Sequence, residues 1–317
     1  MPIKKIKTQK SKLSNIINEK IEKIRLDNTN GSLELTKQAA DILIFLVDNV
    51  SVNSSSEIIN LIHDTTNRLI KAQPIMASIF NLTNTILLEN IGLKNKEEIK
   101  QNVHKSCQLF MQHLELSKKI ISELTVKIIR DYNTVITHSY SSTLLNTLIF
   151  AKEAGKNINI ICTESRPMNE GVLLAKQLGK KGIKVKLIVD AGIFSILPEA
   201  DIILVGADAI SSSGLVNKIG TYGLAIAAKQ YNKPIYALCS IDKILPGSYP
   251  LIFKYQKNPR EIISKPIKNV KPINYYFDLT PLEFITGIIT EKGILSSSEI
   301  LEYINKLKPY DKYFLQN

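Results

Sequence analysis

The sequence predicts an α/β protein in which an all-helical N-terminal domain, residues 1–130, precedes a domain built on a parallel sheet, residues 131–317. Three observations support this prediction. Apolar residues recur at helical spacing in the first part of the chain, short β-rich runs alternate with helix-like segments after Tyr132, and polar residues follow each β-rich run. Such alternation is typical of βαβ units, in which right-handed crossovers join the strands of a parallel sheet.

The first domain is expected to begin with a frayed basic tail over residues 1–10. Apolar residues at helical spacing, such as Leu13, Ile17 and Ile21, then predict a series of helices. The predicted helices cover residues 13–25, 33–50, 57–72, 75–88 and 97–130, the last segment as one or two helices. Pro74 separates the third helix from the fourth. This domain carries neither a glycine-rich phosphate loop nor zinc-ligand spacing, so it is expected to hold no cofactor site.

The second domain is expected to contain strands that alternate with helices. The predicted strands cover residues 134–137, 158–163, 185–189, 202–205, 235–238 and 275–278. The predicted helices cover residues 142–154, 169–180, 192–197, 222–231, 281–290 and 296–307. Gly155 and Gly182 follow two of the helical segments, where glycine commonly ends a helix.

The chain is strongly basic, with a formal net charge of +12. This charge favours acidic partners such as RNA, an acidic protein face or a phosphorylated metabolite. The lysines are spread along the whole chain, tryptophan is absent, and no aromatic-plus-basic RNA signature occurs. A generally solvated basic surface is therefore favoured over nucleic-acid binding.

Several classes of protein are disfavoured by missing motifs. No run of eighteen apolar residues predicts a transmembrane helix, and the charged N-terminus has no apolar core typical of a secretory signal. Cys107, Cys162 and Cys239 have no metal or redox spacing, so the chain is expected to be cytoplasmic, with reduced thiols and no cofactor. The absence of GxGxxG after the first strand and of GxxxxGK[ST] disfavours a dehydrogenase and a P-loop NTPase.

The stretch 200–223 carries the first candidate site residues. Asp208 follows an apolar strand, and ligand sites of open α/β sheets lie at such carboxyl ends. Asn217 and Lys218 are expected to return to the same crevice from a polar loop, as a hydrogen-bonding amide and as a cation for an anionic ligand. A purely structural role for Asp208 in the turn remains open, and spacing alone slightly favours it.

Other polar residues follow the neighbouring strands. Ser141 and Ser142 lead into a helix N-terminus, which is a favourable position for an anion. Arg166 and Lys243 follow two other strands and add positive charge. If the strands are parallel, these side chains share one edge of the sheet, and a sugar phosphate or a nucleotide would suit this edge.

Six motifs, THSYSSTL, TESRPMNEG, VDAGI, VGADAI, NKIGT and YFDLTPLEFI, occur in this order and resemble the family of initiation factor 2B alpha, beta and delta subunits. That family includes methylthioribose-1-phosphate isomerase and archaeal ribose-1,5-bisphosphate isomerase. The resemblance covers roughly residues 30–310. It implies a helical domain followed by a Rossmann-like domain, with a homodimer formed through the C-terminal domain. It also implies translation initiation factor 2 or related subunits as possible protein partners.

The resemblance also identifies candidate catalytic residues. The isomerases of the family use a cysteine and an aspartate, and the aspartate falls on Asp208. Ser139 occupies the position of the cysteine, and THSYS is closer to the factor subunits, which lack this cysteine. A thiol with a pKa near 8.5 can move a proton between sugar carbons, whereas a serine hydroxyl is too weak unless a strong partner activates it. Because neighbouring strand residues point to opposite faces, a dyad of Ser139 with His138 is not expected.

Two further departures from the isomerases remove expected cations. The turn over residues 30–32 is Asn-Gly-Ser where the isomerases carry an Arg-Gly-Ala-like turn, and Gln73 stands before Pro74 where they tend to carry arginine. The sequence therefore favours a regulatory or binding protein of the initiation factor 2B class, without isomerase turnover but with a pocket for a sugar phosphate or nucleotide. The alternative is an aldose–ketose isomerase of a phosphorylated ribose, such as ribose 1,5-bisphosphate or methylthioribose 1-phosphate, which needs a replacement for the thiol.

Overall fold

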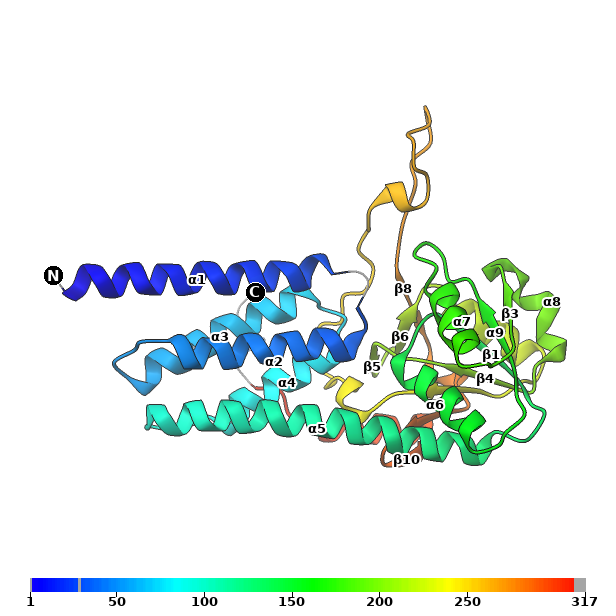
Figure 1. Ribbon diagram of the computed structural model, residues 1–317, viewed down its shortest axis with the longest axis horizontal. Helices are drawn as coiled ribbons and strands as arrows, with labels where there is room; N and C mark the ends of the chain where they lie inside the picture. Colours follow the sequence, from blue (N-terminus) through cyan, green and yellow to red (C-terminus); the bar gives the residue numbers. More distant parts are fainter. Residues whose placement is uncertain (1, 28–29, 311–317) are drawn as a thin grey trace. The chain divides into compact units, whose positions relative to one another are not determined.

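The computed structural model describes residues 2–27 and 30–310, and these form two compact units (Figure 1). The first unit contains the described residues up to Glu115 together with residues 308–310, and the second contains residues 116–307. The division lies inside the long helix α5 (Lys96–Ile128). The domain boundary expected at residue 131 stays a prediction.

The first unit is helical. Its elements are α1 (Pro2–Leu26), α2 (Ser32–Asn49), α3 (Ser55–Ala72), α4 (Ala77–Glu89) and the first part of α5. Fully buried side chains from α1 to α4, among them Ile24, Leu43, Ile62 and Phe80, form its core. The expected frayed tail is wrong, because α1 is already helical at Pro2; residue 1 lies outside the described residues. Within the described part of the chain, no helix is both long and apolar enough to cross a membrane.

The second unit is built on a seven-stranded sheet in the order β10-β9-β7-β4-β1-β2-β3. The strands are β1 (Thr134–His138), β2 (Asn159–Thr163), β3 (Val185–Ile188), β4 (Ile202–Val205), β7 (Ile235–Leu238), β9 (Gly287–Thr290) and β10 (Gly293–Leu295). All neighbouring pairs are parallel except β9 with β10. This arrangement confirms the predicted α/β class and places β1 at the centre of the parallel strands.

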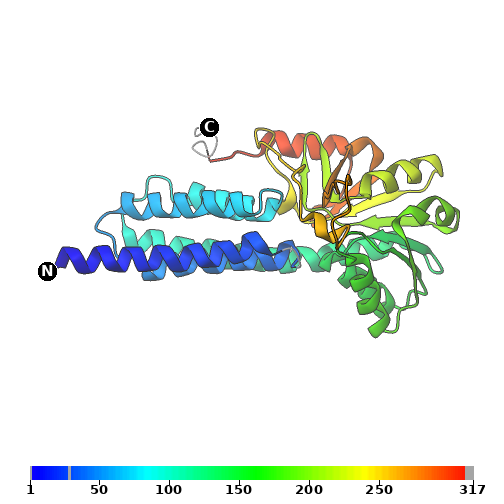
Figure 2. The same ribbon diagram turned by 90° about the horizontal axis from the view of Figure 1, so that it is seen from above.

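Helices cover both faces of this sheet (Figure 2). They are α6 (Ser142–Glu153), α7 (Glu170–Lys180), the short α8 (Ile193–Ile196), α9 (Thr221–Gln230) and α10 (Ser297–Lys306). Successive strand residues alternate between the faces: Ile136 packs in one core with α9 and α10, and Val135 packs in the other with α6 and α7. Because both faces are buried, the central strands are rich in apolar residues, and the polar residues Thr137 and His138 of β1 are buried as well.

A smaller antiparallel sheet corrects the expected polar loop after Asp208. It consists of β5 (Ala209–Ser211), β6 (Gly214–Lys218) and β8 (Phe277–Thr280). The turn between β5 and β6 is only two residues long, and Gly214, with a φ of +142°, follows it. A Cβ on Gly214 would lie 2.5 Å from the carbonyl oxygen of Thr280, so glycine permits the close pairing with β8. Asn217 and Lys218 therefore lie on a buried strand and not on a loop.

The helix expected over residues 281–290 is also wrong. A short 3-10 turn, Leu282–Phe284, leads into β9, which pairs with β7 and β10. The β-branched run from Ile288 to Thr290 fits a buried strand better than a helix. The expected strand at 275–278 begins two residues later, at Phe277, and the segment 97–130 forms one helix.

Candidate active site

The carboxyl ends of β1 and β4 bring the candidate residues to one edge of the sheet. His138 pairs with Val205 across these strands, so the chain segments that contain Ser139 and Gly206 leave the sheet side by side. A Cβ on Gly206 would lie 3.0 Å from the Cβ of Ser141 and 3.9 Å from Oδ1 of Asn217. The absence of a side chain at Gly206 thus allows β1, β4 and β6 to converge beside Asp208. We call this convergence of strand ends the rim.

Ser139 lies in a sharp turn between β1 and α6. Its backbone is left-handed, with a φ of 68°, and its N–H donates to Oγ of Ser165 at 2.7 Å. Ser141 caps α6, because its Oγ accepts a hydrogen bond from the N–H of Leu144 at 3.3 Å. Ser142 is the first residue of that helix and is partly exposed. The turn therefore places the positive end of α6 at the rim, where an anion is favoured.

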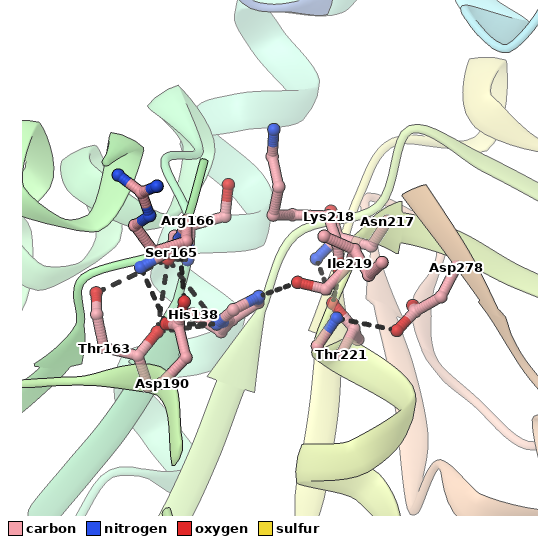
Figure 3. Close-up of polar contacts among 12 residues, drawn as sticks. His138, Thr163, Ser165, Arg166, Asp190, Asn217, Lys218, Ile219, Thr221 and Asp278 are labelled. Atoms are coloured by element: carbon pink, nitrogen blue, oxygen red, sulfur yellow. Dashed lines mark hydrogen bonds and ion pairs between the residues drawn. The ribbon is translucent and has the colours of Figure 1, made fainter. Parts of the chain in front are cut away.

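His138 is buried and both of its ring nitrogens have partners (Figure 3). Nε2 lies 2.8 Å from the carbonyl oxygen of Ile219, and Nδ1 lies 2.6 Å from Oγ1 of Thr163. Burial lowers the pKa of His138, against smaller opposing effects of the Ile219 carbonyl and Asp190. The neutral ring then donates from Nε2 to Ile219 and accepts at Nδ1 from the Thr163 hydroxyl. His138 therefore holds the end of β6 near β2 and has no nitrogen left for Ser139.

Lys218 forms an ion pair with Glu170, a residue that the sequence analysis did not single out. The Nζ of Lys218 contacts Oε1 of Glu170 and lies 4.5 Å from the centre of the Tyr276 ring. Glu170 is the first residue of α7, directly before Gly171. A Cβ on Gly171 would lie 1.7 Å from the carbonyl oxygen of Thr163, so this glycine lets α7 start against the end of β2. Glu170 and Gly171 end the motif TESRPMNEG, which begins at the end of β2, and this motif was the signal in the sequence that connected Glu170 with the strand ends.

Asp208 leaves β4 between opposite charges. Its N–H donates to the carbonyl of Val216 at 2.9 Å, and its side chain remains partly exposed. Burial raises the pKa of the Asp208 carboxyl; Lys243 and Lys218 oppose this rise, and the charge of Glu170 adds to it. Lys243 is fixed beside it, since its Nζ donates to the carbonyl of Ala207 at 2.5 Å. A carboxyl group in this environment favours its protonated form more than a free aspartate does.

Asn217 and Arg166 occupy different positions at the rim. Asn217 is buried, and its Nδ2 donates to Oγ1 of Thr221 at 3.0 Å. Arg166 is exposed, and its guanidinium donates to the carbonyl of Glu261 at 3.2 Å. Asp190 anchors the backbone at Arg166 by accepting from its N–H at 2.7 Å. The structure therefore brings Asn217 into the centre of the rim and leaves the Arg166 side chain at its outer edge.

Aromatic residues from the segment before β8 approach the same site and were also missed. The carboxyl group of Asp208 contributes to raising the pKa of Tyr255 to about 12, although burial is the larger cause. The Nζ of Lys257 lies 5.0 Å from the centre of the Tyr276 ring. These tyrosines are far from the rim in sequence, so no local motif connected them with Asp208.

The three cysteines do not replace the missing thiol. Cys162, the nearest in the sheet, is fully buried in β2, and burial raises its pKa to about 12. Burial has the same effect on Cys107 and Cys239. Such thiols remain protonated and inert. Among the described residues, no group of three or more histidine, cysteine or acidic side chains is placed to hold a metal ion.

Known proteins resemble this chain over most of its length. A ribose 1,5-bisphosphate isomerase of Archaeoglobus fulgidus is 34% identical over 87% of this chain and 88% of its own. The protein of the same name from Methanocaldococcus jannaschii is 34% identical over 88% and 91%. The crystal structure of the Pyrococcus horikoshii translation initiation factor eIF-2B matches with a TM-score of 0.77 and 30% identity, over 88% of this chain and 96% of that chain.

These relatives correct one expectation and establish the family. The preferred interpretation from the sequence, a regulatory initiation factor 2B-like subunit without turnover, is contradicted, because two relatives that are 34% identical over most of this chain are named isomerases. The family model described as initiation factor 2 subunit family matches residues 28–297. The chain belongs to the initiation factor 2 subunit family.

Proposed function

We propose that this chain is an aldose–ketose isomerase that converts ribose 1,5-bisphosphate to its ketose. The observation that carries the proposal is Asp208, a carboxyl group with a raised pKa between Lys218 and Lys243, in a chain whose relatives are named for this reaction. Methylthioribose 1-phosphate is the second candidate, but a basic rim suits a sugar with two phosphates better.

The reaction defines what the site must do. The C1–O4 bond of the ribose ring breaks and O4 gains a proton, while the hydrogen on C2 is removed and a hydrogen is added to C1. The hydroxyl on C2 then loses its proton and becomes the ketone. Oxidation at C2 and reduction at C1 occur in one molecule, so no external oxidant or reductant is needed. A protonated Asp208 suits the role of the acid that gives its proton to O4.

The remaining candidates suit the phosphates and hydroxyls of such a substrate. Ser141 and Ser142 stand at the N-terminus of α6, where backbone N–H groups favour a phosphate. Lys243 follows β7 and Arg166 follows β2, strands on either side of β1 in the sheet, and both contribute positive charge. The buried amide of Asn217 is suited to orient a sugar hydroxyl.

The proposal includes a homodimer formed through the second unit, as the family resemblance implies. Support comes from β3, an edge strand of the large sheet, where Leu187, Val189 and Phe194 expose apolar side chains in and just after the strand. Light scattering of the purified protein tests this part, and a monomer at micromolar concentration would contradict it.

Turnover assays test the main proposal. Purified protein is incubated separately with ribose 1,5-bisphosphate and methylthioribose 1-phosphate, and products are followed by phosphorus NMR. We expect conversion of the bisphosphate, with kcat reduced about 100-fold or more in Asp208→Asn. If only methylthioribose 1-phosphate is converted, that compound is the substrate and ribose 1,5-bisphosphate is not. If neither compound is converted, the proposal of an isomerase is refuted.

A further inference from the structure

The proposed isomerisation needs a base as well as the acid Asp208. The hydroxyl of Ser139 is too weak for this role, both ring nitrogens of His138 are occupied, and the cysteines are buried thiols. The base must therefore be another group at the rim. It must be ionised before the reaction and must have an atom free to accept a proton.

Glu170 meets both requirements in its contacts. Its Oε1 forms an ion pair with Nζ of Lys218. Its Oε2 is buried, and no hydrogen bond to it occurs among the described residues. A buried carboxylate oxygen without a partner is costly, and such atoms are usually satisfied by protein, water or ligand. The free oxygen of Glu170 is therefore suited to face a substrate atom.

Glu170 also lies within electrostatic reach of the other groups of the rim. Its charge acts on His138 at the end of β1, on Asp208 between β4 and β5, and on Tyr276 directly before β8. Lys218 lies against both Glu170 and the ring of Tyr276. Two carboxyl groups therefore lie at the rim, Glu170 in an ion pair with Lys218 and Asp208 near the charges of Lys218 and Lys243. In other enzymes that use two carboxyl groups, such a difference in surroundings makes one group the acid and the other the base.

We infer that Glu170 is the general base of this isomerisation, and that its Oε2 removes the proton from C2 and returns it to C1. The inference rests on the proposed function. Lys218 is then a positioning residue that holds the carboxylate, rather than a phosphate ligand as expected from the sequence.

The proton transfers balance with these two groups alone. Asp208 gives its proton to O4 as the C1–O4 bond breaks, and the bond electrons stay on O4. Glu170 takes the proton from C2, and the C2–H electron pair forms a C1=C2 double bond. Asp208, now ionised, takes the proton from the hydroxyl on C2 as the ketone forms. The proton on Glu170 is transferred to C1, where the electron pair of the C1=C2 double bond forms the new C–H bond. Both residues thereby return to their starting states.

The variant Glu170→Gln tests this assignment, because the amide keeps the shape of the side chain but is not a base. We expect kcat with ribose 1,5-bisphosphate to fall about 100-fold to 10,000-fold. Removing a negative charge beside an anionic ligand is expected to leave binding of the product, ribulose 1,5-bisphosphate, unchanged or tighter in calorimetry. Glu199→Gln, the same change at an exposed ion pair with Lys186, is the matched control and should retain wild-type kcat.

A second variant covers the case in which Glu170→Gln does not fold. Glu170→Asp keeps the charge but shortens the side chain by one methylene, so kcat is expected to fall tenfold or more with product binding retained. A kcat within threefold of wild type in either variant overturns the role of Glu170 and leaves the isomerase intact. Parallel loss of kcat and product binding also overturns it, since that pattern indicates structural damage. No turnover by the wild-type protein overturns both proposals.

Discussion

Asp278 offers a quantitative test of the packing that supports the rim. It lies on β8 opposite Asn217, and its Oδ2 accepts from the N–H groups of Gly220 and Tyr222 at 2.8 and 3.1 Å. The carboxylate thereby caps the N-terminus of α9, the helix that follows Lys218. Burial raises the pKa of Asp278 from 3.8 to about 6, although the two backbone hydrogen bonds act in the opposite direction.

The sign and size of the effect follow from proton linkage. Between pH 3.8 and about 6 the folded chain binds this proton more tightly than the unfolded chain does. The stabilising contribution is therefore complete below pH 3.8 and is lost as the pH rises through about 6. A difference of about two pKa units corresponds to roughly 3 kcal/mol in total, of which about 1.4 kcal/mol is lost between pH 5 and pH 8.

The perturbation is Asp278→Asn, which keeps an oxygen that can accept both N–H groups but does not titrate. The free energy of unfolding of this variant, relative to wild type, is expected to rise by about 1.4 kcal/mol from pH 5 to pH 8. Urea titrations followed by tyrosine fluorescence report the second unit, because ten of the twelve tyrosines lie within residues 116–307 and tryptophan is absent. Asp278→Ala, which removes the cap, should be less stable than Asp278→Asn by about 1 kcal/mol. A stability difference between Asp278→Asn and wild type that stays constant with pH would refute the reasoning.

Two further substitutions test the local geometry and the missing thiol. Gly171→Ala places a Cβ 1.7 Å from the carbonyl oxygen of Thr163, so α7 must shift; urea unfolding should show a loss of about 2–3 kcal/mol, and wild-type stability would contradict the packing. Adding Ser139→Cys to Glu170→Gln should restore part of the lost kcat, rising with pH toward about 8.5 as the thiolate forms. A pH-independent kcat in the double variant would mean that residue 139 does not reach the substrate.

The fold was predictable where local pattern and long-range pairing agree. The apolar runs of β1, β2, β4 and β7 are buried on both faces, so their composition alone indicates parallel strands. The hairpin of β5 and β6 was missed because its short strands resemble a polar loop, and their pairing depends on Gly214 and on β8, some sixty residues away. The run from Gly287 to Thr290 was assigned to a helix because its partner strands are invisible in a local window.

The candidate site was predictable to the same extent. The position of Asp208 follows from the rule that ligands bind at the carboxyl ends of parallel strands. The partners of Lys218 did not follow, because Glu170 and Tyr276 come from segments on either side of it that only the folded chain brings together. Treating Lys218 as a free cation was reasonable from the sequence, and its ion pair changes it into a residue that orients a carboxylate.

The central claim is that carboxyl groups at the rim move protons between C1 and C2 of a phosphorylated ribose. The most direct measurement is NMR of the product formed by the wild-type protein from ribose 1,5-bisphosphate in D₂O. If the base exchanges its proton with solvent before it returns a proton to C1, part of the ribulose 1,5-bisphosphate formed will carry deuterium at C1. The account predicts such a product. Absence of product, with the ribose 1,5-bisphosphate recovered unchanged, would contradict the account.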